Sequence, residues 1–318
     1  MEKMDGGAVM DKLFTVAQVI VPIFAAVALG VLARHKKLLT QEENRGLLQF
    51  VMKFGLPCVI FNSCLTADIK AESFGTMILV LPFLLASTLW AFRARKIKFP
   101  YHNLPQMFDA KETGMLGIPL FMILFGADQA YRIGVLDITQ GIVVFPTLAI
   151  LSANAGENPA PGTIAKKVLT SPLLIMSVLG LGLNLIGVGA WMNTAPIGKV
   201  VIESTAFLAQ PVSAMMIFSV GYNFSLAKSN RAIIFRLSAM HFLWFALSGG
   251  LIQLALFLIP HVDALSRWAI LLYTTLPASY LAPGMGKSRE DVTVASGVCS
   301  VLTVTSLIVF CIIAMIVA

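Results

Sequence analysis

Apolar residues occur in long blocks along this chain, separated by short polar stretches, and they do not alternate with polar residues as in strands. Ten blocks are long enough to cross a hydrocarbon core of about 30 Å as helices that rise about 1.5 Å per residue. They cover approximately residues 13–33, 47–65, 74–92, 105–126, 133–153, 168–188, 201–222, 233–259, 266–286 and 291–317. The pattern predicts an all-α membrane protein with ten transmembrane helices.

Composition supports a lipid environment. Of the 318 residues, 58% are hydrophobic and 12% are charged, whereas a soluble domain carries about 25% charged residues. The net charge is +7, but the basic residues lie in short loops, so they are expected to orient helices and not to bind nucleic acid. The four cysteines lie in apolar blocks without metal-ligand spacing, which predicts free thiols and no metal or cofactor site.

The basic residues also predict an orientation. Fifteen of the 23 lysines and arginines fall in the loops after spans one, three, five, seven and nine, and six fall on the opposite side. The positive-inside rule makes the first side cytoplasmic. The first block ends in Arg34-His35-Lys36-Lys37 and not in small cleavage-site residues, so it is expected to remain as a span. We therefore expect a multi-pass protein of a bacterial-type inner membrane with both termini outside.

The chain divides into two halves of five spans. The longest polar interruption, 154–167, reads as a cytoplasmic linker between a repeat at 1–153 and a repeat at 168–318. An odd number of spans per half inverts the second repeat in the membrane. Three proline pairs have similar separations, although chance pairing is an alternative: Pro22 with Pro172, Pro57 with Pro211, and Pro119 with Pro277. Inverted five-helix repeats are typical of alternating-access carriers.

The fourth block is expected to be a broken helix, because Gly114, Gly117 and Pro119 fall within six residues. Broken backbone persists at membrane depth only where protein or a water-filled cavity satisfies it. Pro119 can begin a second half-helix, whose free N–H groups and partial positive charge would attract a carboxylate at the bilayer midplane. The alternative is that the glycines only allow close helix packing.

The ninth block offers a counterpart at 274–284, where Pro277 interrupts the helix. A second break opposite the first would leave two positive helix ends facing one cavity. The hydroxyls of Thr113, Ser279 and Tyr280 are candidate donors to an anion.

Ionisable residues inside spans are costly and are therefore functional candidates. Glu112, beside the break, and Asp137, five residues into the fifth span, are the candidates for proton or sodium coupling. Asp109, Lys111 and Lys53 could instead pair with one another near the cytoplasmic face.

Other polar residues in the spans leave two interpretations open, because they can line the cavity or only bond neighbouring helices: Asn62, Gln140, Asn184 and Gln210. Asn62 is included among the candidate substrate-binding residues. Four glycines on the sixth span could form a homodimer face or serve contacts within one chain: Gly180, Gly182, Gly187 and Gly189.

Several of these stretches together resemble the auxin efflux carrier family, which includes bacterial malate and malonate permeases. The resembling stretches are Pro22 to Gly30 before a basic turn, Phe50 to Phe61 with Leu56-Pro57, Thr113 to Leu120 ending at Phe125-Gly126, and Leu276-Pro277. The resemblance implies a ten-helix fold with two inverted repeats and crossed, broken helices four and nine, similar to sodium/proton antiporters and bile-acid symporters. It also implies carriage of small carboxylates.

Two positions depart from the family pattern. Family members usually have Asn before the Thr-Gly, whereas this chain has Glu112. Glu112 is then protonated, paired with Lys111 or used for coupling, or the substrate differs from the family norm. In the ninth span, Pro283 and Gly284 follow soon after Pro277 and shorten its second half.

An enzyme is not expected. No Gly-x-Ser-x-Gly motif and no metal-binding His pair occurs, and the histidines, including His241, are assigned to loops or span ends. The sequence therefore predicts a secondary transporter of a small organic anion such as malate, malonate or an auxin-like acid. An uncoupled anion channel or a membrane receptor on the same fold is the alternative.

Overall fold

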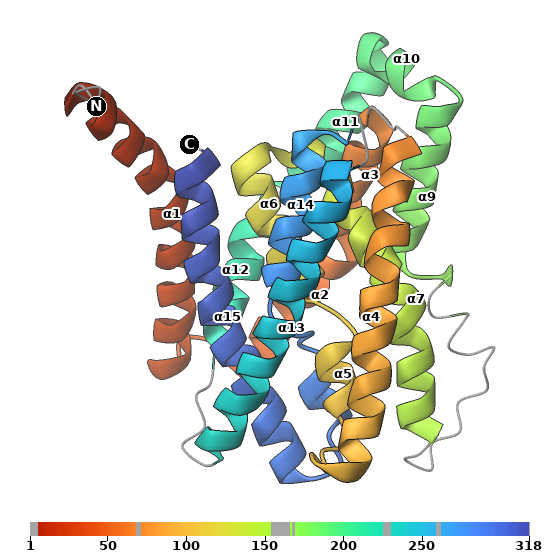
Figure 1. Cartoon of the computed structure of the whole chain (residues 1–318). Helices are drawn as coiled ribbons and strands as arrows, with labels where there is room; N and C mark the ends of the chain where they lie inside the picture. Colours follow the sequence, from red (N-terminus) through yellow and green to blue (C-terminus); the bar gives the residue numbers. More distant parts are fainter. Residues whose placement is uncertain are drawn as a thin grey trace.

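The computed structural model describes residues 6–67, 71–153, 166, 169–224, 230–258 and 262–317. Every regular element in these ranges is helical (Figure 1). The α-helices are α1 (Gly6–His35), α2 (Gln41–Phe50), α3 (Leu56–Thr66), α4 (Ala71–Ile97), α5 (Leu104–Phe108), α6 (Ile118–Phe125), α7 (Tyr131–Ala153), α9 (Pro172–Leu185), α10 (Val188–Thr194), α11 (Pro196–Ala209), α12 (Val212–Asn223), α13 (Arg231–Leu258), α14 (Ala264–Thr275) and α15 (Arg289–Val317). Short helical turns lie at η1 (Val51–Gly55), η2 (Thr113–Gly117), η3 (Ala127–Gln129) and η4 (Ala282–Met285).

Many of these helices have the length and composition of membrane-spanning helices. Among the described residues, six helical segments are long and apolar enough to cross a bilayer, and a seventh results if α9 and α10, which meet at 85°, count as one span. The all-helical prediction is therefore confirmed, whereas the count of ten spans remains a prediction. The predicted linker at 154–167 lies outside the described residues except for Lys166.

The outer helices present large apolar side chains to their surroundings. Val200 and Phe207 on α11 are 61% and 70% exposed, and Leu247 and Phe257 on α13 are 62% and 76% exposed. Contiguous apolar surface of this kind is disfavoured in water but suits lipid.

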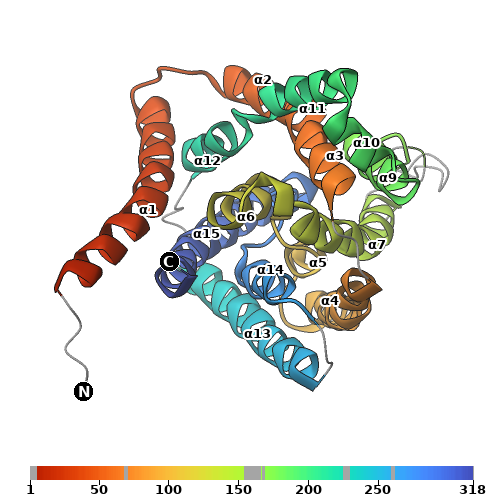
Figure 2. The same cartoon turned by 90° about the horizontal axis from the view of Figure 1, so that it is seen from above.

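Two groups of helices lie side by side in the view from above (Figure 2). In the first, α1 packs on α12, and α3 packs on α9 and α11. In the second, α4 packs on α7, while α13 packs on α14 and α15. α6 lies at the boundary, because it contacts both α12 and α15.

Glycines allow two helix pairs to approach at backbone distance. A Cβ at Gly30 of α1 would lie 2.0 Å from the Phe218 carbonyl oxygen of α12, and a Cβ at Gly180 of α9 would lie 2.7 Å from the Phe61 carbonyl oxygen of α3. Gly189 likewise approaches α3. Gly180 and Gly189, two of the four glycines considered for a dimer face, therefore serve contacts within the chain.

Among the described residues, the fourth and ninth predicted spans are interrupted by non-helical segments, and the first of these lies earlier than predicted. The chain leaves the helix at Asp109–Glu112, between α5 and the helical run Thr113–Phe125 formed by η2 and α6. Pro119 therefore lies inside this run and does not begin it. The wide π-helical turn of η2 precedes Pro119, and such turns accommodate a residue that lacks the backbone N–H.

The second interruption occurs at Pro277, as predicted. α14 ends at Thr275, and Leu276 has an extended conformation because the following Pro277 disfavours helical backbone there. Beyond it, the chain forms only the four-residue turn η4 before α15.

Candidate functional site

The two interruptions cross and pair as short antiparallel segments. The Glu112 N–H donates to the Pro277 carbonyl at 2.9 Å, and the Ser279 N–H donates to the Ala110 carbonyl at 3.3 Å. Lys111 and Ala278 form the bridge between them. Each interruption thus satisfies backbone groups of the other, which is the condition for irregular backbone in a membrane interior.

Gln140 of α7 satisfies the other edge of the first interruption. Its Oε1 accepts from the Lys111 N–H at 2.9 Å, and its Nε2 donates to the Lys111 carbonyl at 3.0 Å. The Tyr273 hydroxyl of α14 donates to the same Oε1 at 3.0 Å. One side-chain amide therefore replaces the missing helical partners of Lys111. Of the two interpretations of Gln140, the structure supports bonding to a neighbouring element.

The Glu112 carboxylate joins the two interruptions through a second contact. Oε1 accepts from the Met115 N–H at 3.2 Å, at the N-terminus of the helical run that begins at Thr113. Oε2 accepts from the Tyr280 N–H of the second interruption at 2.6 Å. Backbone N–H groups at the two interruptions thus bind a carboxylate of the chain itself, and they lie before the half-helix at Pro119 where such donors were predicted or, for Tyr280, in the other interruption. Such charge-assisted hydrogen bonds are stronger than neutral ones.

Asp137 belongs to the same cluster. The Thr113 hydroxyl and the Gln140 amide both donate to Asp137 Oδ1, the amide at 2.8 Å. The Gln140 amide also donates to the Thr113 hydroxyl oxygen at 2.8 Å. The structure therefore brings together both predicted coupling residues, Glu112 and Asp137, and the predicted donor Thr113. The Thr113 hydroxyl is already committed to an internal carboxylate.

Lys111 points away from this cluster and does not pair with Asp109 or Lys53. Its Nζ lies 2.8 Å from His241 Nε2, 3.1 Å from the Leu276 carbonyl oxygen and 3.4 Å from the centroid of the Phe245 ring. Lys53 is exposed on η1. The prediction that Asp109, Lys111 and Lys53 pair with one another is wrong, because the Lys111 side chain points toward α13 where the two interruptions cross.

His241 corrects a second expectation. It lies in the interior of α13 and is fully buried, not at a span end. Its ring lies 5.2 Å from the Phe108 ring and 4.7 Å from the Phe245 ring, measured between centroids. The i, i+4 spacing of His241 and Phe245 places both on one helix face. That spacing was the only feature of the sequence that indicated that His241 and Phe245 contact Lys111 together.

Asp109 and Gln106 are fully buried, and neither side chain has a hydrogen-bond partner among the described residues. The Thr147 hydroxyl lies near Asp109 but donates to the Val143 carbonyl at 2.9 Å. Such groups are costly to bury unless water or a ligand reaches them.

The remaining candidate residues divide between the crossing and its surroundings. Gly117 and Pro119 are buried in the helical run, and Gly114 is half-buried. The Tyr280 hydroxyl bonds the Thr303 hydroxyl at 2.6 Å, and the Ser279 hydroxyl accepts weakly from the Leu281 N–H at 3.3 Å.

Asn62 lies outside the crossing. Its Oδ1 accepts from the Thr205 hydroxyl at 2.7 Å, so it ties α3 to α11. Asn184 similarly donates to the Cys64 and Ala67 carbonyls of the α3 end. Both therefore bond neighbouring helices in this conformation.

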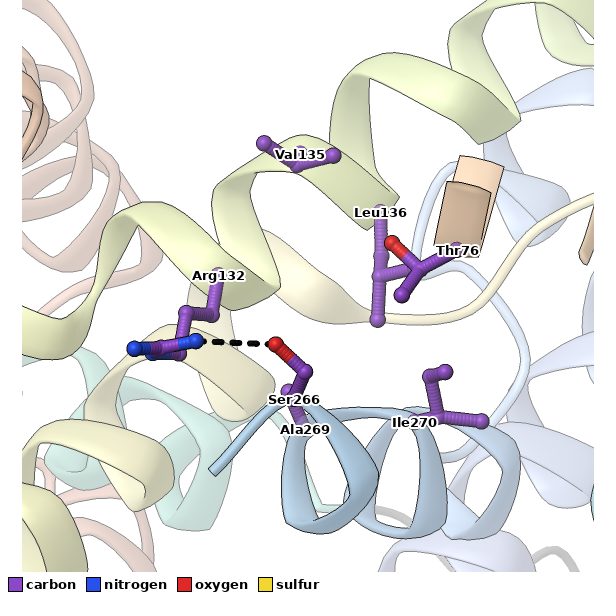
Figure 3. A pocket seen from close by; sticks show the side chains of 7 residues that line it. All are labelled: Thr76, Arg132, Val135, Leu136, Ser266, Ala269 and Ile270. Carbon is purple, nitrogen blue, oxygen red and sulfur yellow. Dashed lines mark hydrogen bonds between the residues drawn. The ribbon is translucent and has the colours of Figure 1, made fainter. Parts of the chain in front are cut away.

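Two cavities lie between helices that surround the crossing. A groove of about 370 Å³ between α4 and α13 is almost entirely apolar, and Phe108, which contacts His241, lines it. A second cavity of about 10 Å³, about the size needed for one water, lies between α4, α7 and α14 (Figure 3).

Arg132 bridges α7 to the start of α14 at the smaller cavity. It donates to the Ser266 hydroxyl at 2.8 Å, as Figure 3 shows, and to Asp263 at 2.5 Å. Partial burial raises the pKa of Asp263, but hydrogen bonds from Ser266 and Arg132 outweigh this effect, so the pKa lies below the usual 3.8. Asp263 also caps α14 by accepting from the Ser266 N–H at 2.8 Å.

No protein-family model and no curated protein matches this chain. The interpretation of the crossing therefore depends on its own geometry.

Proposed function

We propose that this protein is a secondary transporter that carries a small organic anion by alternating access, coupled to protons or sodium. The observation that carries the proposal is the crossing itself, where two interrupted helices place backbone N–H groups and ionisable side chains in the interior. The Met115 and Tyr280 N–H groups already hold one carboxylate, that of Glu112. Donors arranged for a carboxylate group support an acid substrate at the same place.

The helix contacts support two inverted repeats. In the two predicted repeats, α1, α3, α4 and α7 correspond in order to α9, α12, α13 and α15. The contact of α1 with α12 is then equivalent to the contact of α9 with α3, and the contact of α4 with α7 is equivalent to the contact of α13 with α15. Both members of each pair are present. Gly30 and Gly180, which are 150 residues apart, make equivalent backbone approaches at the first two contacts.

The division of the helices into two groups, seen in Figure 2, supports a transport cycle in which one group moves against the other. Each group draws helices from both predicted repeats, and the interrupted helices lie in one group near the boundary. Such a movement would open the crossing alternately to each side of the membrane.

The direct test is counterflow of labelled malate, malonate or indole-acetate in proteoliposomes, with and without a proton gradient. The proposal expects saturable exchange of at least one of these acids. Glu112→Gln and Asp137→Asn are expected to uncouple exchange from the gradient while binding persists in at least one of them. Ligand binding without flux would support a receptor, and flux without saturation or coupling would support a channel; either result would reject the transporter.

A further inference from the structure

Lys111 is a buried lysine that the proposed transport of an anion does not explain. Its side chain is 2% exposed, and no carboxylate of the described residues forms an ion pair with it. A lysine in such a place is costly unless its ammonium group is otherwise compensated. The groups that can stabilise its ammonium form are therefore the neutral ones beside it.

Three neutral groups surround the Lys111 nitrogen. The first is His241 Nε2 at 2.8 Å, and the second is the Leu276 carbonyl oxygen at 3.1 Å. The third is the face of the Phe245 ring, whose centroid lies 3.4 Å away. An ammonium group has three N–H donors and attracts a ring face through its charge. A neutral amine would gain little from that ring, so the set of contacts fits a cation.

The position of Leu276 adds a further attraction. Leu276 is the C-cap of α14, so its carbonyl belongs to the negative end of that helix. The second interruption thus presents an acceptor for a cation, while Tyr280 in the same segment presents a donor for the Glu112 carboxylate.

We propose that the Lys111 ammonium is a tethered occupant of a monovalent-cation site formed by His241, Phe245 and the Leu276 carbonyl. A protein that lacks this ammonium group takes up a small free cation of the ammonium or methylammonium class in its place. In the wild-type protein the site is filled by the chain itself. If the proposed transport function holds, this site is not where a coupling sodium binds in the wild-type protein.

The test uses the purified full chain in detergent and the variant Lys111→Ala, with methylammonium chloride as the probe. Methylammonium is expected to raise the apparent melting temperature of Lys111→Ala by a few degrees, in a saturable manner. Sodium chloride and tetramethylammonium chloride at equal ionic strength are expected to have smaller effects. Equal shifts with all three salts, or none with methylammonium, would overturn the proposal.

Three variants make the result specific. Lys111→Met fills the same space without a charge, so methylammonium should not shift it. Lys53→Ala removes an exposed lysine and should also give no shift. Adding Phe245→Leu to Lys111→Ala removes the ring face and should weaken the response several-fold; an undiminished response would place the cation elsewhere and overturn the assignment.

Lys111→Ala can also be purified with and without methylammonium, in case the variant is unstable. Recovery of monodisperse protein only with methylammonium would support the site, and failure under both conditions would contradict it. Absence of any counterflow would reject the transport function alone, because the melting experiment tests the cation site independently.

Discussion

The two interruptions cross at the same place, but they contribute different chemistry. The first, Asp109–Glu112, supplies charged side chains and then continues into the helical run Thr113–Phe125. The second supplies backbone groups, namely the Leu276 and Pro277 carbonyls and the Tyr280 N–H. The first interruption therefore provides the charged side chains, and the second provides the backbone groups that bind them. This difference predicts that side-chain substitutions matter more in the first interruption than in the second.

The largest effect is expected from Glu112→Ala. It removes the acceptor of the Met115 and Tyr280 N–H groups, and each donor left without a partner costs about 1–3 kcal/mol of unfolding free energy. Equilibrium unfolding in mixed micelles measures the loss. Glu203→Ala, an exposed glutamate of α11, is the matched control and should change stability little. Equal effects of the two variants would remove Glu112 as the link between the interruptions.

The next effect comes from steric contact between the interruptions. A Cβ at Gly117 would lie 2.5 Å from Leu276 Cδ1 and 3.2 Å from Ile133 Cδ1, so Gly117→Val should cost about 1–3 kcal/mol. At Gly114, three residues earlier, the nearest atom is Met52 Cε at 4.0 Å. Gly114→Val should therefore be milder in the same unfolding measurement. A milder Gly117 variant would contradict the packing of this helical run on Leu276.

Paired hydroxyl deletions compare the interruptions directly. Thr113→Val removes a hydrogen bond to the Asp137 carboxylate, which is expected to cost about 1.5–3 kcal/mol. Ser279→Ala removes only the long contact with the Leu281 N–H and should cost less than about 1 kcal/mol. The two variants can be ranked by apparent melting temperature. The reverse ranking would mean that the second interruption also depends on its side chains.

A small, pH-dependent effect is expected at the start of α14, the helix that leads into the second interruption. Asp263→Ala removes the cap and the Arg132 pair and should cost about 1 kcal/mol at pH 7. The folded-state pKa of Asp263 lies below its usual value, so its contribution is present above about pH 4 and is lost as the pH falls through that lower pKa. The difference between wild type and variant should then shrink below pH 4. Asp263→Asn, which keeps a capping oxygen, should lose less at pH 7.

Much of the fold could be predicted from the order of residues. Long unbroken apolar blocks, without the alternation of strands, form helices in lipid because a helix satisfies every backbone group within one segment, and the all-helical fold follows from that constraint. Gly114, Gly117 and Pro119 indicated an interruption in the fourth block, although its non-helical part lies earlier, at Asp109–Glu112. Pro277 marked the second interruption correctly because proline restricts the residue before it.

The sequence by itself also selected Glu112 and Asp137, since charged residues in apolar blocks are rare and costly. It did not determine the contacts of the charged residues at the crossing, as Lys111 shows. Gln140 fills the backbone gap of Lys111, and His241 lies beside its ammonium group, although they are 29 and 130 residues away in the chain. These partners became known only from the packing of the helices. An interrupted helix leaves backbone and charged groups without partners in their own helix, so their hydrogen bonds depend on which distant helices pack beside them.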